Sequence, residues 1–234
     1  MSMKDKREQA IDLFKKSQFD SAISLFLDVV KTDSNDFSAF YMLGQCYKFN
    51  RQLTEAIESL EKSVQVMNKV GTDNDMKGSI YLALGIAYQN SQEFKKAIVT
   101  LQKGIGCNPK SFALHNSLGL TYKMIENYKE SVLSYYRARE IILKNASYTK
   151  NVKLEDGTES LHLEMDKTYF KLQSSPEYCI VMNNIGTVYL EAGDLESAEK
   201  AFKESIEFIP QGYNYPPPTE AIDYINSIKN DIKK

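Results

Sequence analysis

The chain has 234 residues, of which 42% are hydrophobic and 26% charged, and its formal net charge is −2. This composition is typical of an ordinary globular protein, and the charge balance gives no sign of a nucleic-acid or membrane-surface binder. The first ten residues lack the apolar core of a secretory signal, and no apolar run approaches the ~18 residues of a membrane-spanning helix. Three scattered cysteines indicate a reducing compartment, so we expect a cytoplasmic location without membrane insertion.

The first seventy residues read as two helix-turn-helix repeats. Apolar residues at helical spacing predict helices over 4–16 and 21–30, which together form a first repeat at 3–36. The second repeat, at 37–70, follows without a gap and has a clearer pattern, carried by Phe40, Leu43, Gly44, Tyr47, Leu53, Ala56 and Leu60. The less regular first repeat is typical of the end of an array, where one side faces solvent.

Residues 71–145 contain a short insertion and then one pattern written twice. The insertion, 71–77, has turn residues and an Asp able to cap the next helix. The repeats at 78–111 and 112–145 share a pattern thirty-four residues apart, the period of one helix-turn-helix repeat. The first copy carries Tyr81, Leu84, Gly85, Tyr88, Phe94, Ala97 and Leu101; the second carries His115, Leu118, Gly119, Tyr122, Tyr128, Ser131 and Tyr135.

A second insertion, 146–175, has two interpretations. Asp156-Gly157 is a type I′ turn signal flanked by apolar residues at spacing two, which predicts a β-hairpin with Val152 opposite Leu161. Leu161 and Met165 also begin a helical stripe, so a helix stays open as the alternative. The pattern returns in a fifth repeat at 179–212, and residues 219–233 predict a last helix with a polar outer face that caps the array.

The recurring Leu-Gly-x-x-Tyr, followed by Ala and then by an aromatic residue or Leu four positions later, resembles the tetratricopeptide repeat (TPR). The resemblance implies an all-α fold: a right-handed α-solenoid of about five helix-turn-helix repeats plus a C-terminal capping helix, in one domain over 1–234. Gly at the eighth position and Ala at the twentieth lie where the two helices of a repeat would cross closely. The Trp usual at the fourth position is absent, and Phe40, Tyr81, His115 and Met182 replace it.

The resemblance also implies a groove lined by the first helix of each repeat. The expected peptide-binding residues are Tyr41, Gln45, Lys48, Leu82, Ile86, Asn116, Leu120, Lys123, Asn183, Asn184 and Thr187. Gln89 stands at another of the ligand-contact positions that the resemblance implies. The asparagines could pair with a peptide backbone without reading its sequence. Formal charge on this surface is lopsided, with Lys4, Arg7, Lys15, Lys48 and Lys123 against Glu191, which favours an acidic peptide with apolar anchors; a solvated face with scattered lysines is an equal alternative.

One function found in the resembling family requires particular residues, so the absence of those residues argues against that function here. TPR proteins that bind chaperone tails hold a terminal carboxylate with Lys and Asn in one helix, Asn in the next, and Lys and Arg in the third. The matching positions here are Arg7, Ile11, Met42, Ser79 and Ala83 in repeats one to three, and Tyr41, Gln45, Ala83, Ala113 and Ser117 in repeats two to four. Neither set forms that clamp, so we expect no binding of such tails.

We expect no catalysis, cofactor or metal site. The two histidines, His115 and His162, stand apart, and no Cys/His cluster has metal-ligand spacing. Gly104-Ile105-Gly106 lacks the third Gly of a phosphate loop and follows a helix, so Gly104 is better explained by packing. The favoured function is a scaffold or adaptor that binds another protein or a peptide. The alternatives are a self-associating assembly protein, which keeps homo-oligomerisation open, and a chaperone or regulatory subunit of a larger complex.

Overall fold

The computed structural model describes residues 2–147, 149–153, 159–163, 165–216 and 218–232. Its contacts divide the chain into two compact units, Met1–Thr121 (the N-terminal unit) and Tyr122–Lys234 (the C-terminal unit), and the boundary falls within helix α7 (Phe112–Met124). The sequence predicts one continuous domain. Since each repeat of an array contacts only its neighbours, the array has no core shared by all of its helices and can divide between any two of them.

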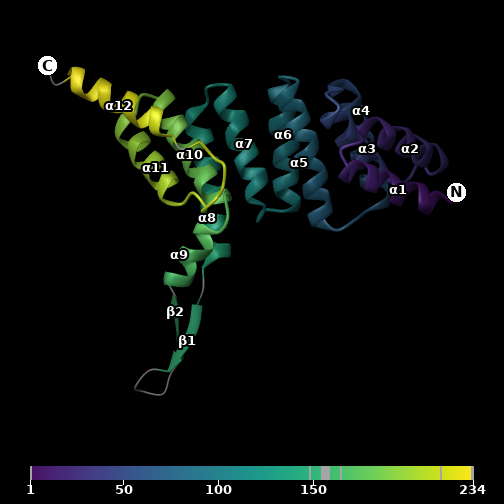
Figure 1. Ribbon diagram of the computed structural model, residues 1–234. Helices are drawn as coiled ribbons and strands as arrows, with labels where there is room; N and C mark the ends of the chain where they lie inside the picture. The colour runs from purple at the N-terminus through teal and green to yellow at the C-terminus, as the bar shows by residue number, and fades with distance from the viewer. Residues whose placement is uncertain (1, 148, 154–158, 164, 217, 233–234) are drawn as a thin grey trace. The chain divides into compact units, whose positions relative to one another are not determined.

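The N-terminal unit contains three complete helix pairs followed by α7 (Figure 1). The pairs are α1 (Met3–Lys15) with α2 (Phe19–Thr32), α3 (Phe37–Phe49) with α4 (Leu53–Val70), and α5 (Asn74–Asn90) with α6 (Phe94–Cys107). Phe26, Val29 and Leu43 form one buried cluster, and Leu60 and Leu84 belong to the next. The core is therefore a series of layers between neighbouring helices rather than one centre.

The short insertion at 71–77 mostly lengthens a helix. Gly71 ends α4 with a φ of +80°, a left-handed conformation that glycine adopts without strain. Asp73 then caps α5, because its carboxylate accepts a hydrogen bond from the Met76 N–H at 2.8 Å. The predicted capping by Asp is confirmed, and α5 begins at Asn74, inside the segment that the repeat pattern treats as extra.

The turn inside each helix pair has the same backbone geometry. Its left-handed residue is Ser17, Arg51, Gln92, Glu126 or Gly193, with φ between 58° and 82°. In every case the next residue donates its N–H to the carbonyl five positions earlier, as Gln52 does to Tyr47 at 2.9 Å, which is the long hydrogen bond of a Schellman motif. Ser17 and Arg51 stand thirty-four residues apart, so the turn of the irregular first repeat lies at the same position as the turn of the second.

The glycine at the eighth position of a repeat allows the two helices to approach. A Cβ added to Gly85 would lie 2.6 Å from the Leu101 side chain, and one added to Gly186 would lie 2.6 Å from the Phe202 ring. Both distances are far inside van der Waals contact, so the close approach predicted at Gly is confirmed. The side chain that fills the space opposite is the one at position twenty-four.

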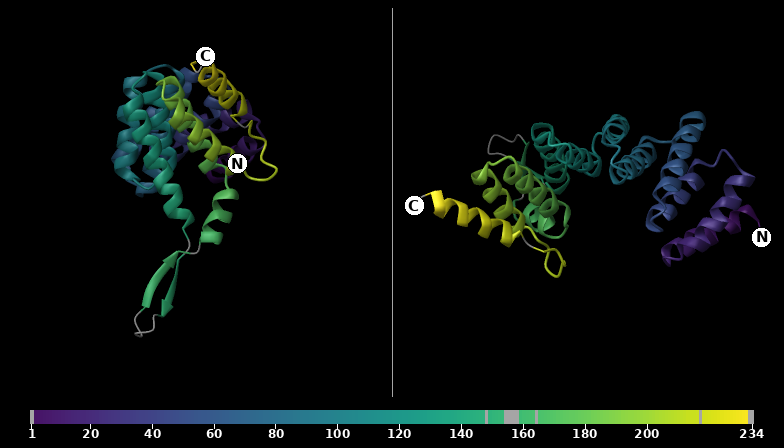
Figure 2. Two further views of the ribbon diagram at one scale, coloured as in Figure 1. Left: turned by 90° about the vertical axis from the view of Figure 1, so that its left-hand side faces the viewer. Right: turned by 90° about the horizontal axis from the view of Figure 1, so that it is seen from above.

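The C-terminal unit begins with the last turn of α7 and contains five more helices within the described residues. They are α8 (Tyr128–Ala146), α9 (Met165–Gln173), α10 (Glu177–Glu191), α11 (Leu195–Glu207) and α12 (Thr219–Ile232). Helix α12 lies against α11 (Figures 1 and 2), where Ile225 is fully buried beside Ala198 and Phe202. The expected last helix thus covers an apolar face of the fifth repeat.

The second insertion contains a pair of antiparallel strands, β1 (Thr149–Lys153) and β2 (Glu159–Leu163) (Figure 1). Leu161 pairs with Asn151. The predicted pairing of Leu161 with Val152 is therefore wrong by one residue. The predicted two-residue turn at Asp156-Gly157 lies outside the residues that the structure describes. The helical interpretation fits only from Met165, where α9 begins.

Candidate peptide-binding surfaces

Helix α5 carries the clearest candidate surface of the N-terminal unit. Most of its residues, including Tyr81, Leu84 and Tyr88, are buried against α3, α4 and α6. Leu82 and Ile86 remain half-exposed and stand four residues apart, so they share one face of the helix. A solvent-facing stripe of a helix is normally polar. Two accessible aliphatic side chains on such a stripe therefore mark a surface suited to contact with another molecule.

Helix α3 carries three of the predicted residues, and Tyr41 is the one that packs against clusters containing residues of α5. Tyr41 packs against the buried Tyr81 and Leu84 of α5, so its ring joins the two helices and is only partly accessible. Gln45 and Lys48 are half-buried on the same helix. The Lys48 ammonium lies 4.6 Å from the centroid of a neighbouring aromatic ring, and burial lowers the pKa of Lys48. Lys48 is thus a partly desolvated cation beside an apolar surface.

Helix α7 contributes Asn116 and Leu120, which are half-exposed and again four residues apart. Gln89 does not join them on the surface. Its side chain is buried, and its amide donates hydrogen bonds to the Ser117 carbonyl at 2.9 Å and to the Thr121 hydroxyl at 2.7 Å. Gln89 therefore links α5 to α7, and the expectation that it would face a ligand is wrong.

The remaining predicted residues belong to the C-terminal unit. Lys123 forms an ion pair with Glu191 at 3.1 Å, between the last turn of α7 and the end of α10. Thr187 donates its hydroxyl to the backbone carbonyl of Asn183 at 2.9 Å, and both side chains are half-exposed, as is Asn184. Seven of the eleven predicted residues thus belong to the N-terminal unit and four to the C-terminal unit.

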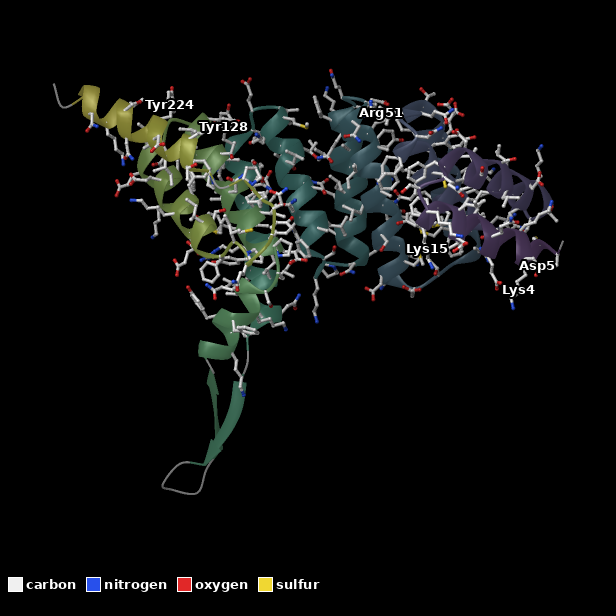
Figure 3. All side chains as sticks on the ribbon, viewed as in Figure 1. Lys4, Asp5, Lys15, Arg51, Tyr128 and Tyr224 are labelled. Atoms are coloured by element: carbon white, nitrogen blue, oxygen red, sulfur yellow. The ribbon has the colours of Figure 1, made fainter. Side chains whose placement is uncertain are left out.

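The basic charge expected on these surfaces is largely paired. Arg7 bonds to Asp36, which also caps α3, and Lys4 lies 3.9 Å from an acid one turn further along α1. Lys123 pairs with Glu191, as described above. Lys15, which extends from the end of α1 (Figure 3), and Lys48 have no ion pair among the described residues. Counting charges along the first helices overstates the free charge, because some of the neutralising acids come from neighbouring segments.

A pocket that the sequence did not predict lies in the C-terminal unit between α8, α10 and α11. Its volume is about 240 Å³. Met182 of α10 and Ala201 of α11 are buried at its base, while Tyr136 of α8 and Lys200 of α11 are exposed at its edge. The repeat pattern constrains residue type mainly at packing positions, so it carried no signal for exposed residues of this kind.

Hydrogen bonds order the walls of this pocket. The hydroxyls of Tyr136 and Tyr189 lie 3.3 Å apart, and burial together with this hydrogen bond raises the pKa of Tyr189 to about 12. On the other side, the Arg139 guanidinium bonds to a Glu204 carboxylate oxygen at 3.0 Å and to the Tyr178 hydroxyl at 3.2 Å. These pairs fix polar groups from three helices around an apolar base.

His115 and Gly104, which were weighed above as catalytic or phosphate-binding residues, have structural roles. The His115 ring nitrogen lies 3.2 Å from the Pro109 carbonyl, and a Cβ on Gly104 would lie 2.6 Å from Leu114. Within the ranges that the structure describes, no three His, Cys, Asp or Glu residues are grouped to hold a metal ion. In the same ranges, no helix is long and apolar enough to cross a bilayer.

Antiparallel helix pairs with a common turn, close crossings at Gly44, Gly85 and Gly186, and a layered core define an α-helical repeat protein. The tetratricopeptide repeat family profiles match residues 36–110 and 181–211. Over these two ranges the chain consists of tetratricopeptide repeats.

Its relatives are distant. The chain is 27% identical over 116 residues to the BBSome complex member BBS4 of Mus musculus, a match that covers 50% of this chain and 21% of that protein. It is 24% identical over 107 residues to the Hsp70-Hsp90 organizing protein 3 of Arabidopsis thaliana, covering 46% and 18%. The chain thus spans about a fifth of the length of either relative. A crystal structure of the MamA protein matches with a TM-score of 0.65 at 23% identity, over 88% of this chain and 91% of that one, and shows the shared fold.

Proposed function

We propose that the chain is a non-catalytic protein–protein interaction scaffold that binds a peptide segment of a partner across α3, α5 and α7. The observation that carries this proposal is the aliphatic stripe of Leu82 and Ile86. It lies on a helix whose other faces are occupied by packing, so burial of this stripe by a partner needs no rearrangement of the repeat. Leu120 supplies a third aliphatic side chain on α7.

The chemistry of the surface favours a peptide with apolar anchors. Burying an aliphatic side chain contributes about 1.5–3 kcal/mol, so two or three anchors supply most of the affinity of a micromolar complex. Asn116 on α7, with Asn183 and Asn184 on α10, offers amides suited to a peptide backbone. Acidic residues in the peptide would have a secondary role, because Lys15 and Lys48 are the cations of this surface left without ion pairs in the described ranges.

The test is selection of peptides from a random library on the intact chain, followed by affinity measurement with the selected peptide. We expect the double variant Leu82→Ser with Ile86→Ser to bind it at least tenfold more weakly. Val99→Ser is the matched control, since Val99 is an aliphatic residue of the neighbouring α6 and is 52% exposed. Equal losses in the two variants, or no loss in the first, would show that the α5 stripe is not the binding surface.

Self-association is the second candidate, and one observation favours it. Phe170 of α9 is 73% exposed, and the nearby two-stranded sheet leaves an unpaired edge on each strand. Exposed edges and large apolar side chains are common contacts between copies of a chain. Light scattering at ~50 µM should then give more than the monomer mass for the native chain and the monomer mass for Phe170→Ser. A monomer in both cases would remove this candidate.

We also propose a cytoplasmic location. Cys46, Cys107 and Cys179 are free, and Cys46 and Cys179 are buried, where burial raises the pKa of each thiol. Unpaired buried thiols suit a reducing compartment. A fluorescent fusion in intact cells would test the location directly, and its accumulation in an oxidising compartment would contradict this proposal.

A further inference from the structure

The pocket of the C-terminal unit lies on a different face of α10 from the predicted peptide-binding residues. Met182 and Tyr189, which line the pocket, stand seven residues apart and so share one face of the helix. Asn184 is two positions from Met182, and Thr187 is two positions from Tyr189. At 3.6 residues per turn, two positions correspond to about 200° around the helix. The pocket is therefore separate from the predicted binding residues on α10, and all of its lining residues belong to the C-terminal unit.

We infer that this pocket is a second binding site, and that its ligand is the carboxylate side chain of an acidic residue in a partner protein. The volume of about 240 Å³ lies below the range of about 300–1,000 Å³ that is usual for small-molecule and cofactor pockets, so it suits one side chain rather than a cofactor. The buried Met182 and Ala201 provide an apolar base for a methylene stem. The charged and hydroxyl groups lie around it and would meet the tip.

Hydrogen-bond donors exceed acceptors around the pocket. Whichever of Tyr136 and Tyr189 donates to the other, one hydroxyl proton of the pair is left to donate to a ligand. Lys200 is exposed, has three N–H donors and has no ion pair among the described residues. Arg139 donates one N–H to the Tyr178 hydroxyl and one to the Glu204 carboxylate, which leaves other guanidinium N–H groups. A ligand that fits this surplus is an acceptor.

Charge decides between an anionic and a cationic ligand. Arg139 and Lys200 outweigh the single acid Glu204, and one oxygen of Glu204 already accepts from Arg139 and Tyr178. A cation entering the pocket would face two positive charges and a carboxylate that is already committed. A carboxylate carries one negative charge, which matches the net single positive charge of the lining better than the −1.5 to −2 of a phosphate group.

The experiment titrates the ¹⁵N-labelled full chain with N-acetyl-glutamate N-methylamide and follows amide shifts by NMR. We expect saturable shifts on α8, α10 and α11, and at least fivefold weaker binding of the glutamine analogue, which has the same shape and no charge. Lys200→Met should weaken binding of the glutamate probe at least fivefold. Lys203→Met is the matched control, because Lys203 is an exposed lysine of the same helix that pairs with Glu199 and does not line the pocket.

Three results would overturn the inference. The first is no saturable shift of these amides up to ~50 mM probe, and the second is equal binding of the glutamate and glutamine probes. The third is equal weakening by Lys200→Met and Lys203→Met, which would reflect the net charge of α11 alone. Inorganic phosphate is titrated separately, and tighter binding of phosphate than of the glutamate probe would also reject a carboxylate site. Binding to the α5 stripe is measured with the selected peptide, so failure at either site is distinguishable from failure at the other.

Discussion

Removal of one oxygen atom from each of two buried tyrosines should change stability in opposite directions. Tyr135 of α8 is 0% exposed, and its hydroxyl has no hydrogen-bond partner among the described residues. Tyr178 of α10 is 2% exposed, but its hydroxyl accepts from Arg139 and donates to Glu204. The substitutions Tyr135→Phe and Tyr178→Phe leave the rings in place, so the difference between them isolates the hydrogen bonds.

The magnitudes follow from the partners of each hydroxyl. A buried polar group without a partner costs about 1–3 kcal/mol, so Tyr135→Phe should leave stability unchanged or raise it by up to about 1 kcal/mol after local repacking. A hydrogen bond to a charged group contributes about 1.5–3 kcal/mol. Because Arg139 and Glu204 are partly exposed and keep their own ion pair, Tyr178→Phe should cost about 1–2 kcal/mol.

Thermal unfolding followed by circular dichroism measures both effects. For a chain of this length, 1 kcal/mol shifts Tm by about 2–4 °C, so Tyr178→Phe should melt about 2–8 °C below the native chain and Tyr135→Phe at or above it. The double mutant Tyr178→Phe with Glu204→Gln should lose less than the sum of its parts, because the two groups share one hydrogen bond. A loss above 1 kcal/mol in Tyr135→Phe would refute the reasoning, since that hydroxyl would then have a partner.

Three further predictions concern other parts of the chain. Hydrogen bonds from Lys203 and Lys229 hold the pKa of Glu199 down at about 2, so the stability that Glu199 contributes is present above its ordinary pKa of 4.5 and lost as pH falls toward 2. The protection of the α12 amides against hydrogen exchange should fall as the pH falls over that range. It should fall less in the Glu199→Gln variant. Arg51→Gly should stabilise the chain by about 0.5–1 kcal/mol in urea unfolding, because a left-handed residue other than Gly costs about 1–2 kcal/mol, partly offset by the chain entropy of Gly; a lower stability would contradict this. An acidic C-terminal heptapeptide of the chaperone-tail type should show no binding below ~100 µM by calorimetry, since the clamp positions lack the required Lys, Asn and Arg; micromolar binding that is lost on substitution of those positions would overturn it.

The features of the fold that repeat could be predicted from the sequence. Gly85 and Gly186 each stand opposite a large side chain at position twenty-four, and this geometric requirement recurs in every well-formed repeat, so spacing alone reveals it. The turn at Ser17 is also a repeated feature, and what repeats there is the backbone conformation. Its backbone matches that of Arg51 although few side chains of the first repeat fit the pattern, because main-chain hydrogen bonds define the turn.

Features that occur once could not be predicted in the same way. Leu161 pairs with Asn151 rather than with the predicted Val152, so the spacing of the apolar residues did not specify the strand register. Gln89 looked like a surface residue because glutamine is usually exposed, yet Ser117 and Thr121 satisfy its amide inside the protein. For Gln89, partners 28 and 32 residues further along the chain decided the outcome.

The pairing of charges changes which interactions can give the α5 surface its affinity. Arg7 already neutralises Asp36, so an acidic peptide would have to displace this partner to gain from the cation. Leu82 and Ile86 have no such competitor, because water is the alternative environment for their exposed parts. Attraction between charges separated by more than ~8 Å is largely screened at physiological salt, whereas burial of aliphatic surface is not. Affinity at this surface should therefore come from the aliphatic stripe, and charge should act mainly on the rate of encounter.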